Sequence, residues 1–272
     1  MKHILRLERL PMSSELQTPD SKNVLRAAVS RGEITVYYQP QVSAETGALA
    51  GVECLVRWRH PERGFISPAE FLPAVADDEH IIQLLGETVL RQACEDAAAW
   101  PDIVIGVNIS PVQFRLPELA GRIIAIAKEE GFPLNRLELE ILESSYFENP
   151  AHMREVLTGL RVQGIRIALD DFGTGYSSLA ALLELPLDKL KIDSGFVKKF
   201  DDLRGAPIIH SITTLALAIG LKVTAEGVET HAQQIFLRAA GCHFLQGYLF
   251  SEPVAADAIT RMIASGKMWP CD

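Results

Sequence analysis

Hydrophobic residues along the chain gather in eight short runs that are rich in valine, isoleucine, leucine, phenylalanine and tyrosine. Runs of this composition, bounded by turn-forming residues, are typical of β-strands. From the second run onward, longer segments with helical character separate them, so strand and helix alternate. The predicted strands are residues 34–42, 49–58, 102–110, 136–143, 166–172, 190–194, 221–228 and 243–250. The predicted helices are residues 79–100, 111–131, 151–164, 206–220 and 230–241, with a shorter one between 177 and 188.

The spacing of the runs predicts how the strands are connected. Only SAETGA, residues 43–48, separates the first two runs, whereas a parallel crossover needs about a dozen residues. Those two runs therefore form a hairpin, and each later gap can hold a crossover helix. The pattern predicts an α/β fold, a TIM-like (β/α)8 barrel with the first strand antiparallel. An open, doubly wound sheet is the alternative that strand periodicity leaves standing.

The two ends of the chain differ in character. We interpret residues 1–20, with two prolines and two serines, as an N-terminal tail or a linker from an upstream domain, and residues 21–272 as one domain. The start, MKHILRLERLP, has too short an apolar stretch for a signal peptide. The longest apolar segment, 208–221, includes a histidine, a serine and two threonines and fits a buried helix. We therefore predict no membrane span in this chain.

Charge and cysteine content narrow the choice of ligand and location. The net charge of −9 and the isoelectric point near 5.3 argue against a DNA or RNA partner. An anionic ligand can still bind where metal ions supply positive charge locally. The four cysteines lie far apart, without a C-x-x-C pair, so neither a zinc knuckle nor a disulfide framework is indicated. We expect a reduced, cytoplasmic location.

Most of the predicted strands carry a polar residue near the carboxyl end. In a barrel these ends meet at one mouth, which is where TIM-barrel enzymes keep their active sites. The set is Glu53, Asn108, Glu140, Asp170 with Asp171, Lys191, Glu226 and Gln246. Alternation along LELEIL places Leu139 on the helix side and Glu140 in the mouth. Glu138 lies one layer deeper, where we expect a structural ion pair with a lysine or arginine.

The residue types in this set point to metal chemistry. Carboxylates and an asparagine oxygen, with no histidine, suit Mg²⁺, Mn²⁺ or Ca²⁺ better than zinc or copper. The clustered carboxylates can stay ionised together only beside cations. Two divalent ions about 3.5–4 Å apart are typical of phosphodiester hydrolysis. The adjacent Asp170 and Asp171 suit such a pair, since one can bridge both ions and the other can bind the second.

Short motifs spread over residues 20–265 resemble, in the same order, those of the EAL-domain family. The Glu-Ala-Leu triplet that names the family, within E-x-L-x-R, corresponds to ECLVR at 53–57. The most specific string is DDFGTGYSSL at 170–179. The other matching strings are YQP (38–40), NIS (108–110), ELEILE (138–143), KID (191–193), AEGVET (225–230) and QGYLFSEP (246–253).

The resemblance implies a cyclic di-GMP phosphodiesterase, which hydrolyses this bacterial second messenger to linear 5′-pGpG with two Mg²⁺ or Mn²⁺ ions. We expect Ca²⁺ to inhibit, because its longer bonds and looser coordination disturb a two-metal geometry. The implied metal ligands are Glu53, Asn108, Glu140, Asp170, Asp171 and Glu226. The implied catalytic residues are Lys191, which holds the attacking water, with Glu53, Asp170, Asp171 and Glu226. The implied substrate-binding residues are Gln39, Leu55, Arg57, Gln246 and Glu229, the last two also supporting the second metal.

The resemblance also bears on regulation. The segment after Asp171 resembles the family's mobile loop, which links the metal site to a dimer interface, with Glu143 as its anchoring carboxylate. A homodimer, and an upstream sensory or GGDEF domain in the full-length protein, are further implications. The alternative function is an inactive EAL-type receptor that binds cyclic di-GMP and signals to a partner. A metal-dependent hydrolase of another phosphate ester is a second alternative.

One residue departs from the family pattern. Cys54 stands where the name-giving triplet has alanine. Alternation directs its side chain away from that of Glu53 and toward the helices, where a thiol behaves as a small hydrophobic group. We therefore expect little effect on chemistry.

Overall fold

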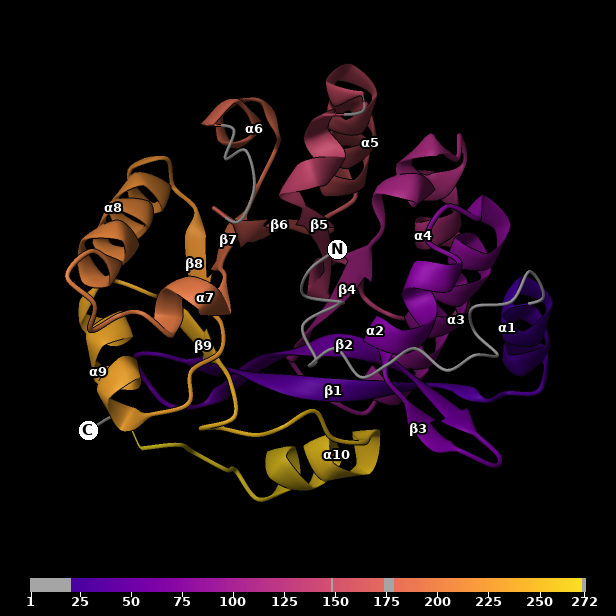
Figure 1. Cartoon of the computed structure of the whole chain (residues 1–272), viewed down its shortest axis with the longest axis horizontal. Coiled ribbons are helices and arrows are strands. Elements are labelled where there is room, and N and C mark those ends of the chain that lie inside the picture. The colour runs from indigo at the N-terminus through magenta and orange to yellow at the C-terminus, as the bar shows by residue number, and fades with distance from the viewer. Residues whose placement is uncertain (1–20, 148, 174–178, 271–272) are drawn as a thin grey trace.

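The structure is a computed structural model that describes residues 21–147, 149–173 and 179–270. Its strands form one sheet in the order β1-β9-β8-β7-β6-β5-β4-β2-β3, and pairing of β1 with β2 closes all of them except β3 into a barrel. Helices α3, α4, α5, α8 and α9 lie around the outside of the strands (Figure 1). The predicted tail at residues 1–20 lies outside the described residues.

The bounds of the elements are as follows. The strands are β1 (Ile34–Ser43), β2 (Leu49–His60), β3 (Gly64–Ile66), β4 (Val104–Ile109), β5 (Leu137–Leu142), β6 (Arg166–Phe172), β7 (Lys189–Ile192), β8 (Lys222–Ala225) and β9 (Phe244–Gln246). The α-helices are α1 (Ser21–Ser30), α2 (Pro68–Phe71), α3 (Glu79–Ala97), α4 (Leu119–Glu129), α5 (Pro150–Val162), α6 (Leu179–Glu184), α7 (Ser194–Val197), α8 (Gly205–Ala218), α9 (His231–Ala239) and α10 (Ala256–Ala264). The 3₁₀ turns are η2 (Leu72–Ala74), η3 (Pro111–Arg115), η4 (Leu134–Arg136) and η5 (Glu143–Phe147).

The predicted barrel is confirmed, and the open sheet is wrong, because β1 pairs with β2 on one side and β9 on the other. Both pairings of β1 are antiparallel, whereas β2 and β4 to β9 pair in parallel around the rest of the barrel. Ile34, at the start of β1, lies opposite Trp58, near the end of β2. The first strand therefore begins at the rim where the other strands end.

Several boundaries differ from the sequence prediction. The predicted helix 111–131 is divided into η3 and α4, because Pro117 lacks the N–H that a continuing helix needs. The predicted strand 243–250 is only three residues long. After Gln246 the chain turns close to the backbone of Val228, where a Cβ on Gly247 would lie 2.2 Å from the Val228 oxygen. Strand β3 and helices α1 and α10 were not among the predicted elements.

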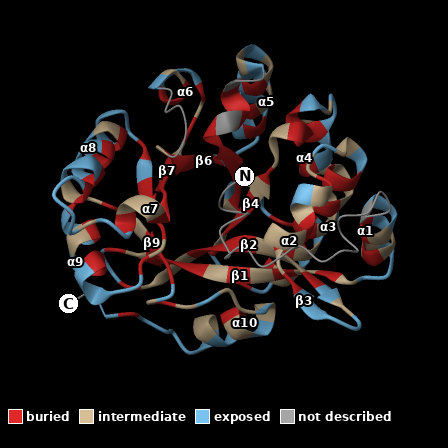
Figure 2. Cartoon of the chain, in the orientation of Figure 1, coloured by how far each residue is buried: buried red, intermediate tan, exposed pale blue. Residues whose placement is uncertain are grey.

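The main hydrophobic core lies between the barrel strands and the surrounding helices, where Figure 2 shows the strands buried and the outer helix faces exposed. On β5, Leu137, Leu139 and Ile141 belong to this core, as alternation predicts. A second cluster, which includes Leu25, Trp58 and Phe71, packs α1 and α2 against β2. In the described part of the chain, no helix is both long and apolar enough to cross a bilayer.

Candidate active site

The polar residues at the strand ends converge, as the sequence predicts, on the ammonium group of Lys191 at the end of β7. Its Nζ lies 2.7 Å from Oε1 of Glu226, 3.4 Å from Oε2 of Glu53 and 3.4 Å from Oδ1 of Asp170, and it also pairs with Glu140. The Lys191 side chain is completely buried. Strands β2, β5 and β6 and the segment directly after β8 thus bring their carboxylates to one lysine.

Burial and the opposite charges nearby shift the pKa values of these groups in opposite directions. Burial alone would lower the pKa of Lys191, but the carboxylates of Asp170, Glu140, Glu226 and Glu53 outweigh it and hold that pKa well above its usual range. Burial raises the pKa of Glu140 well above that of an ordinary glutamate, and Lys191 opposes this shift only in part. One ammonium cannot balance so many carboxylates, so the others must be neutralised by protons or by further cations.

A β-bulge in β6 lets two adjacent carboxylates serve this site. The register with β7 shifts between Leu169 and Phe172, so one extra residue is inserted on β6. Asp171 adopts a left-handed conformation with φ of 56°, which is uncommon for a non-glycine residue but is tolerated best by asparagine and aspartate. One carboxylate oxygen from each of Asp170, Asp171 and Glu226 lies within 4.8 Å of the others. Regular alternation would have sent the two aspartates to opposite faces.

The carboxylate cluster fits a divalent metal site by its donor atoms. Oε1 of Glu140 and Oδ2 of Asp170 are buried and accept no hydrogen bond from the described residues. A buried polar atom of this kind normally has a partner, and a bound ion is one explanation. The oxygens suit hard cations such as Mg²⁺ and Mn²⁺. The residues present therefore fit the two-metal group that the sequence predicts.

Gly106 makes room for one of these carboxylates. It lies on β4 opposite Glu138 of β5, two residue pairs before Asn108 and Glu140 and so on the same face of the sheet. A Cβ at Gly106 would lie 2.2 Å from Oε1 of Glu140. The space under the polar layer is therefore filled, at this position, by the glutamate side chain itself.

Amide side chains hold Glu53 from the other side of the site. Asn108 Nδ2 donates to Oε1 of Glu53 at 3.0 Å, and Gln246 Nε2 donates to Oε2 at 2.6 Å. Gln246 Nε2 also lies 3.0 Å from Oε1 of Gln39, whose own Nε2 donates to the backbone oxygen of Ser251 at 3.2 Å. Both Glu53 oxygens thus accept hydrogen bonds before any cation is considered.

One layer deeper, the ion pair predicted for Glu138 is confirmed. Lys189 Nζ lies 2.6 Å from Oε1 of Glu138, and both side chains are buried. Lys189 also donates to Oε1 of Gln41 at 3.4 Å. Sequence reasoning missed Gln41, although it lies two residues after Gln39 and so on the same face of β1.

Above the carboxylates opens a large cleft of about 1580 Å³, lined by residues that include Gln39, Leu55 and Arg57. Burial lowers the pKa of Arg57. Its Nη1 donates to the backbone oxygen of Val56 at 2.9 Å, and its guanidinium carbon lies 5.9 Å from the centre of the Tyr37 ring. The cleft has ample room for a dinucleotide, since ordinary ligand pockets measure about 300–1,000 Å³.

Two further predicted residues contact groups other than Lys191. Glu229 is at the exposed rim of the cleft and pairs with Lys198 at 3.1 Å. Glu143 is buried after β5 and accepts a hydrogen bond from the backbone N–H of Gly173 at 3.4 Å. This contact joins Glu143 to the segment that follows Asp171, of which residues 174–178 lie outside the described part of the chain.

Cys54 lies where alternation predicts. It is buried in the main hydrophobic core, in the same cluster as Cys94 of α3, and burial raises the pKa of its thiol well above the usual value. A buried thiol of raised pKa is unreactive.

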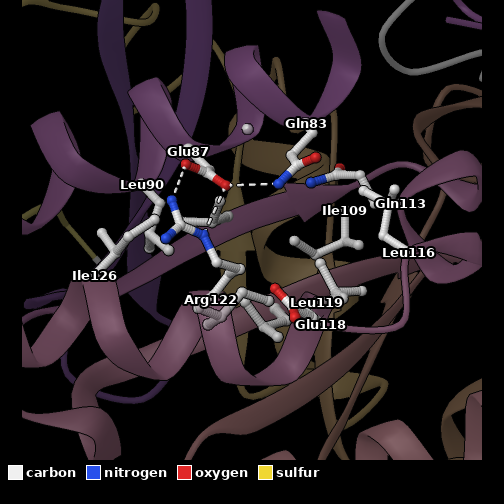
Figure 3. A pocket seen from close by; sticks show the side chains of 14 residues that line it. Gln83, Glu87, Leu90, Ile109, Gln113, Leu116, Glu118, Leu119, Arg122 and Ile126 are labelled. Atoms are coloured by element: carbon white, nitrogen blue, oxygen red, sulfur yellow. Dashed lines mark hydrogen bonds and ion pairs between the residues drawn. The ribbon is translucent and has the colours of Figure 1, made fainter. Parts of the chain in front are cut away.

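A second, much smaller cavity lies between α3 and α4 (Figure 3). It measures about 30 Å³, and Arg122 reaches from α4 to Glu87 of α3, which also accepts a hydrogen bond from Gln83. This volume is far too small for a nucleotide, since ligand pockets measure about 300–1,000 Å³.

Comparison with known proteins agrees with the motifs. A family model described as the EAL domain matches residues 22–253. The bifunctional diguanylate cyclase/cyclic di-GMP phosphodiesterase MucR of Pseudomonas aeruginosa is 39% identical over 246 residues, which are 88% of this chain and 36% of MucR. A solved structure of the PaMucR phosphodiesterase in complex with c-di-GMP has a TM-score of 0.83 at 39% identity, with 88% of this chain and 99% of that chain covered.

A further solved structure adds a metal to the comparison. The manganese/cyclic di-GMP complex of BlrP1 from Klebsiella pneumoniae has a TM-score of 0.73 at 28% identity, with 82% of this chain and 56% of that chain covered. The chain spans about a third of the length of the curated relatives it matches.

Proposed function

The chain belongs to the EAL-domain family, and from that premise we propose that it hydrolyses cyclic di-GMP to linear 5′-pGpG with two divalent cations, Mg²⁺ or Mn²⁺. The observation that carries the proposal is the cluster of buried carboxylates around Lys191 at the base of the cleft. In the reaction, water forms a new bond to phosphorus, the bond from phosphorus to the 3′ oxygen breaks, and that oxygen takes a proton.

We assign the metal ligands to the two sides of the cluster. Glu53, Asn108, Glu140 and Asp170 would hold the first cation, and Asp170, Asp171 and Glu226 the second. The close approach of one oxygen from each of the last three supports the second group. When bound, the cations would neutralise the carboxylates, polarise the phosphodiester and lower the pKa of the attacking water.

The remaining roles belong to protein groups alone. Lys191 would hold and orient the attacking water, and its four carboxylate partners keep its ammonium charged and fixed in place. Gln39, Leu55 and Arg57 line the cleft and would bind the dinucleotide. Gln246 donates to Glu53, so we assign it to the first-metal side rather than to the second-metal side that the sequence resemblance implied. Glu229 would contact the ligand from the rim.

Regulation forms a second part of the proposal. Glu143, through Gly173, would hold the loop that follows Asp171 in the state that binds metal. Leu179 and Leu183 of α6 are 58% and 77% exposed, which supports a homodimer that buries them beside this loop. We further propose a cytoplasmic location and an upstream sensory or GGDEF domain in a longer polypeptide, in keeping with the length of the relatives.

The direct test is incubation of the protein with cyclic di-GMP and Mg²⁺ or Mn²⁺, with the products resolved by chromatography. We expect 5′-pGpG, loss of turnover on chelation, and inhibition by Ca²⁺ because of its longer, looser coordination. Full activity in excess chelator would contradict the metal mechanism. Absence of turnover with retained micromolar binding would instead establish the receptor alternative.

A further inference from the structure

A string of five buried side chains runs through the barrel interior from Glu138 to Glu53. Lys189 Nζ lies 2.6 Å from Oε1 of Glu138 and 3.4 Å from Oε1 of Gln41. Gln41 Nε2 donates to Oε1 of Gln246 at 3.1 Å, and Gln246 Nε2 donates to Oε2 of Glu53 at 2.6 Å. The string therefore links the deep ion pair to a carboxylate of the candidate active site.

The end groups of the string, Lys189 and Glu53, determine in which direction its hydrogen bonds are donated. A lysine ammonium can only donate hydrogen bonds, and an ionised carboxylate can only accept them. Each glutamine amide has one donating and one accepting end, so Gln41 and Gln246 align head to tail between Lys189 and Glu53. Lys189 lies between Gln41 and Glu138 and donates to both. Because an ammonium only donates, the Gln41 oxygen, and not its nitrogen, faces Lys189.

We propose that Gln41 is a positioning residue, which passes the orientation set by Lys189 to the amide of Gln246 and so keeps a donor facing Glu53. This inference rests on the proposed function, in which Glu53 is a metal ligand. Gln41 lies directly opposite Gln246 in the antiparallel pairing of β1 with β9, so the two amides are neighbours by strand register.

A reversed Gln246 amide would harm two groups together. Its nitrogen donates to Oε2 of Glu53 and to Oε1 of Gln39, and both of these atoms are acceptors. After reversal, the Gln246 oxygen would face these two oxygens, and Oε2 of Glu53 would lose its 2.6 Å donor while keeping the longer contact with Lys191 Nζ at 3.4 Å. Loss of a buried hydrogen bond to a charged group, with repulsion in its place, is sufficient to weaken metal binding about tenfold or more.

Two substitutions at one position separate positioning from simple packing. Gln41→Glu keeps the shape and the contact with Lys189, but offers only acceptors, so the new carboxylate competes with Glu53 for the amide nitrogen of Gln246. The lysine ammonium keeps the new carboxylate ionised. Gln41→Met has a similar volume but removes the donor to Oε1 of Gln246 without offering a competing acceptor. Positioning predicts that the glutamate is the more harmful change, whereas packing and lost hydrogen bonds predict that the methionine is.

The measurement is calorimetric titration of each protein with Mn²⁺ alone, together with the unfolding midpoint and turnover of cyclic di-GMP. We expect Mn²⁺ binding about tenfold or more weaker in Gln41→Glu, and a smaller loss of about threefold in Gln41→Met. Equal Mn²⁺ binding in all three proteins, or a greater loss in Gln41→Met, overturns the inference. A wild-type protein that binds no Mn²⁺ would instead overturn the proposed function.

A second variant covers the case in which Gln41→Glu does not fold. The exchange Glu138→Lys with Lys189→Glu conserves the net charge and the buried ion pair, but places an acceptor next to Oε1 of Gln41. We expect the same loss of Mn²⁺ affinity as for Gln41→Glu. Unchanged affinity in the folded exchange variant overturns the inference. Lys189→Arg, which keeps a donor at this point, serves as the matched control and should bind Mn²⁺ like wild type.

Discussion

Replacement of Gly106 by alanine tests whether the position of the Glu140 carboxylate controls catalysis. The new Cβ would lie 2.2 Å from Oε1 of Glu140 and 3.0 Å from its Cδ. The lower limit of an ordinary contact is 3.4 Å, so the carboxylate must retreat by about 1.2 Å. It cannot do so freely, because Glu140 is buried and pairs with Lys191.

The expected loss is large for catalysis and small for the fold. A displacement of about 1 Å at a reacting centre can lower the rate about 100-fold, so we expect kcat in Gly106→Ala to fall by about that factor. One added methyl group in a packed interior costs about 1–3 kcal/mol of folding free energy. A domain of this size should therefore stay folded at room temperature with a lower melting temperature.

The assay compares kcat for cyclic di-GMP, at saturating Mn²⁺, with the thermal unfolding midpoint of the same preparation. Gly51→Ala is the matched control, because its Cβ would lie 3.0 Å from the backbone oxygen of Val104 and 3.5 Å from Oε1 of Gln41, with no carboxylate among its nearest atoms. We expect this control to lose stability with a much smaller change in kcat. A folded Gly106→Ala protein with kcat within threefold of wild type would refute the reasoning.

Two further predictions concern Lys191 and Glu143. Lys191→Met should lower kcat by about 100-fold or more with little change in nucleotide affinity, because a group that orients the attacking water acts mainly in the transition state. Steady-state kinetics checks this, and an increase in KM alone would assign Lys191 to substrate binding. Glu143→Ala removes the acceptor of the Gly173 N–H and should weaken both the Mg²⁺ dependence of turnover and the dimer. The tests are a titration of activity with Mg²⁺ and sedimentation of the mutant and wild-type proteins. If neither measurement differs between the two proteins, the loop is a simple turn.

The overall fold was predictable because it depends on patterns local in the sequence. Each strand is a short hydrophobic run, and the short link at 43–48 was enough to indicate the antiparallel start. The same alternation placed Glu138 below Glu140, and its depth predicted an ion pair with a lysine or arginine, which is Lys189. Strand β3 was not predicted, because three residues are too few to show a recognisable strand pattern.

The details of the site depend on features that no local pattern contains. The β6 bulge at Asp170 and Asp171 arises from its pairing with β7, so the sequence suggested two useful acids without showing how both could face inward. Gln41 meets Gln246 only because barrel closure brings together strands about 200 residues apart. The ion pair of Glu229 with Lys198 likewise depends on how the loops after β7 and β8 meet.

The reversed first strand changes where a neighbouring domain can be joined. In a barrel built only of parallel strands, the chain enters at the floor, opposite the catalytic mouth. Here β1 runs the other way, and Ile34 begins it beside Trp58 at the mouth. A sensory module fused ahead of α1 in a longer polypeptide would thus be tethered on the substrate-entry side. Such a fusion could control access to the cleft by position alone, without a signal having to cross the barrel.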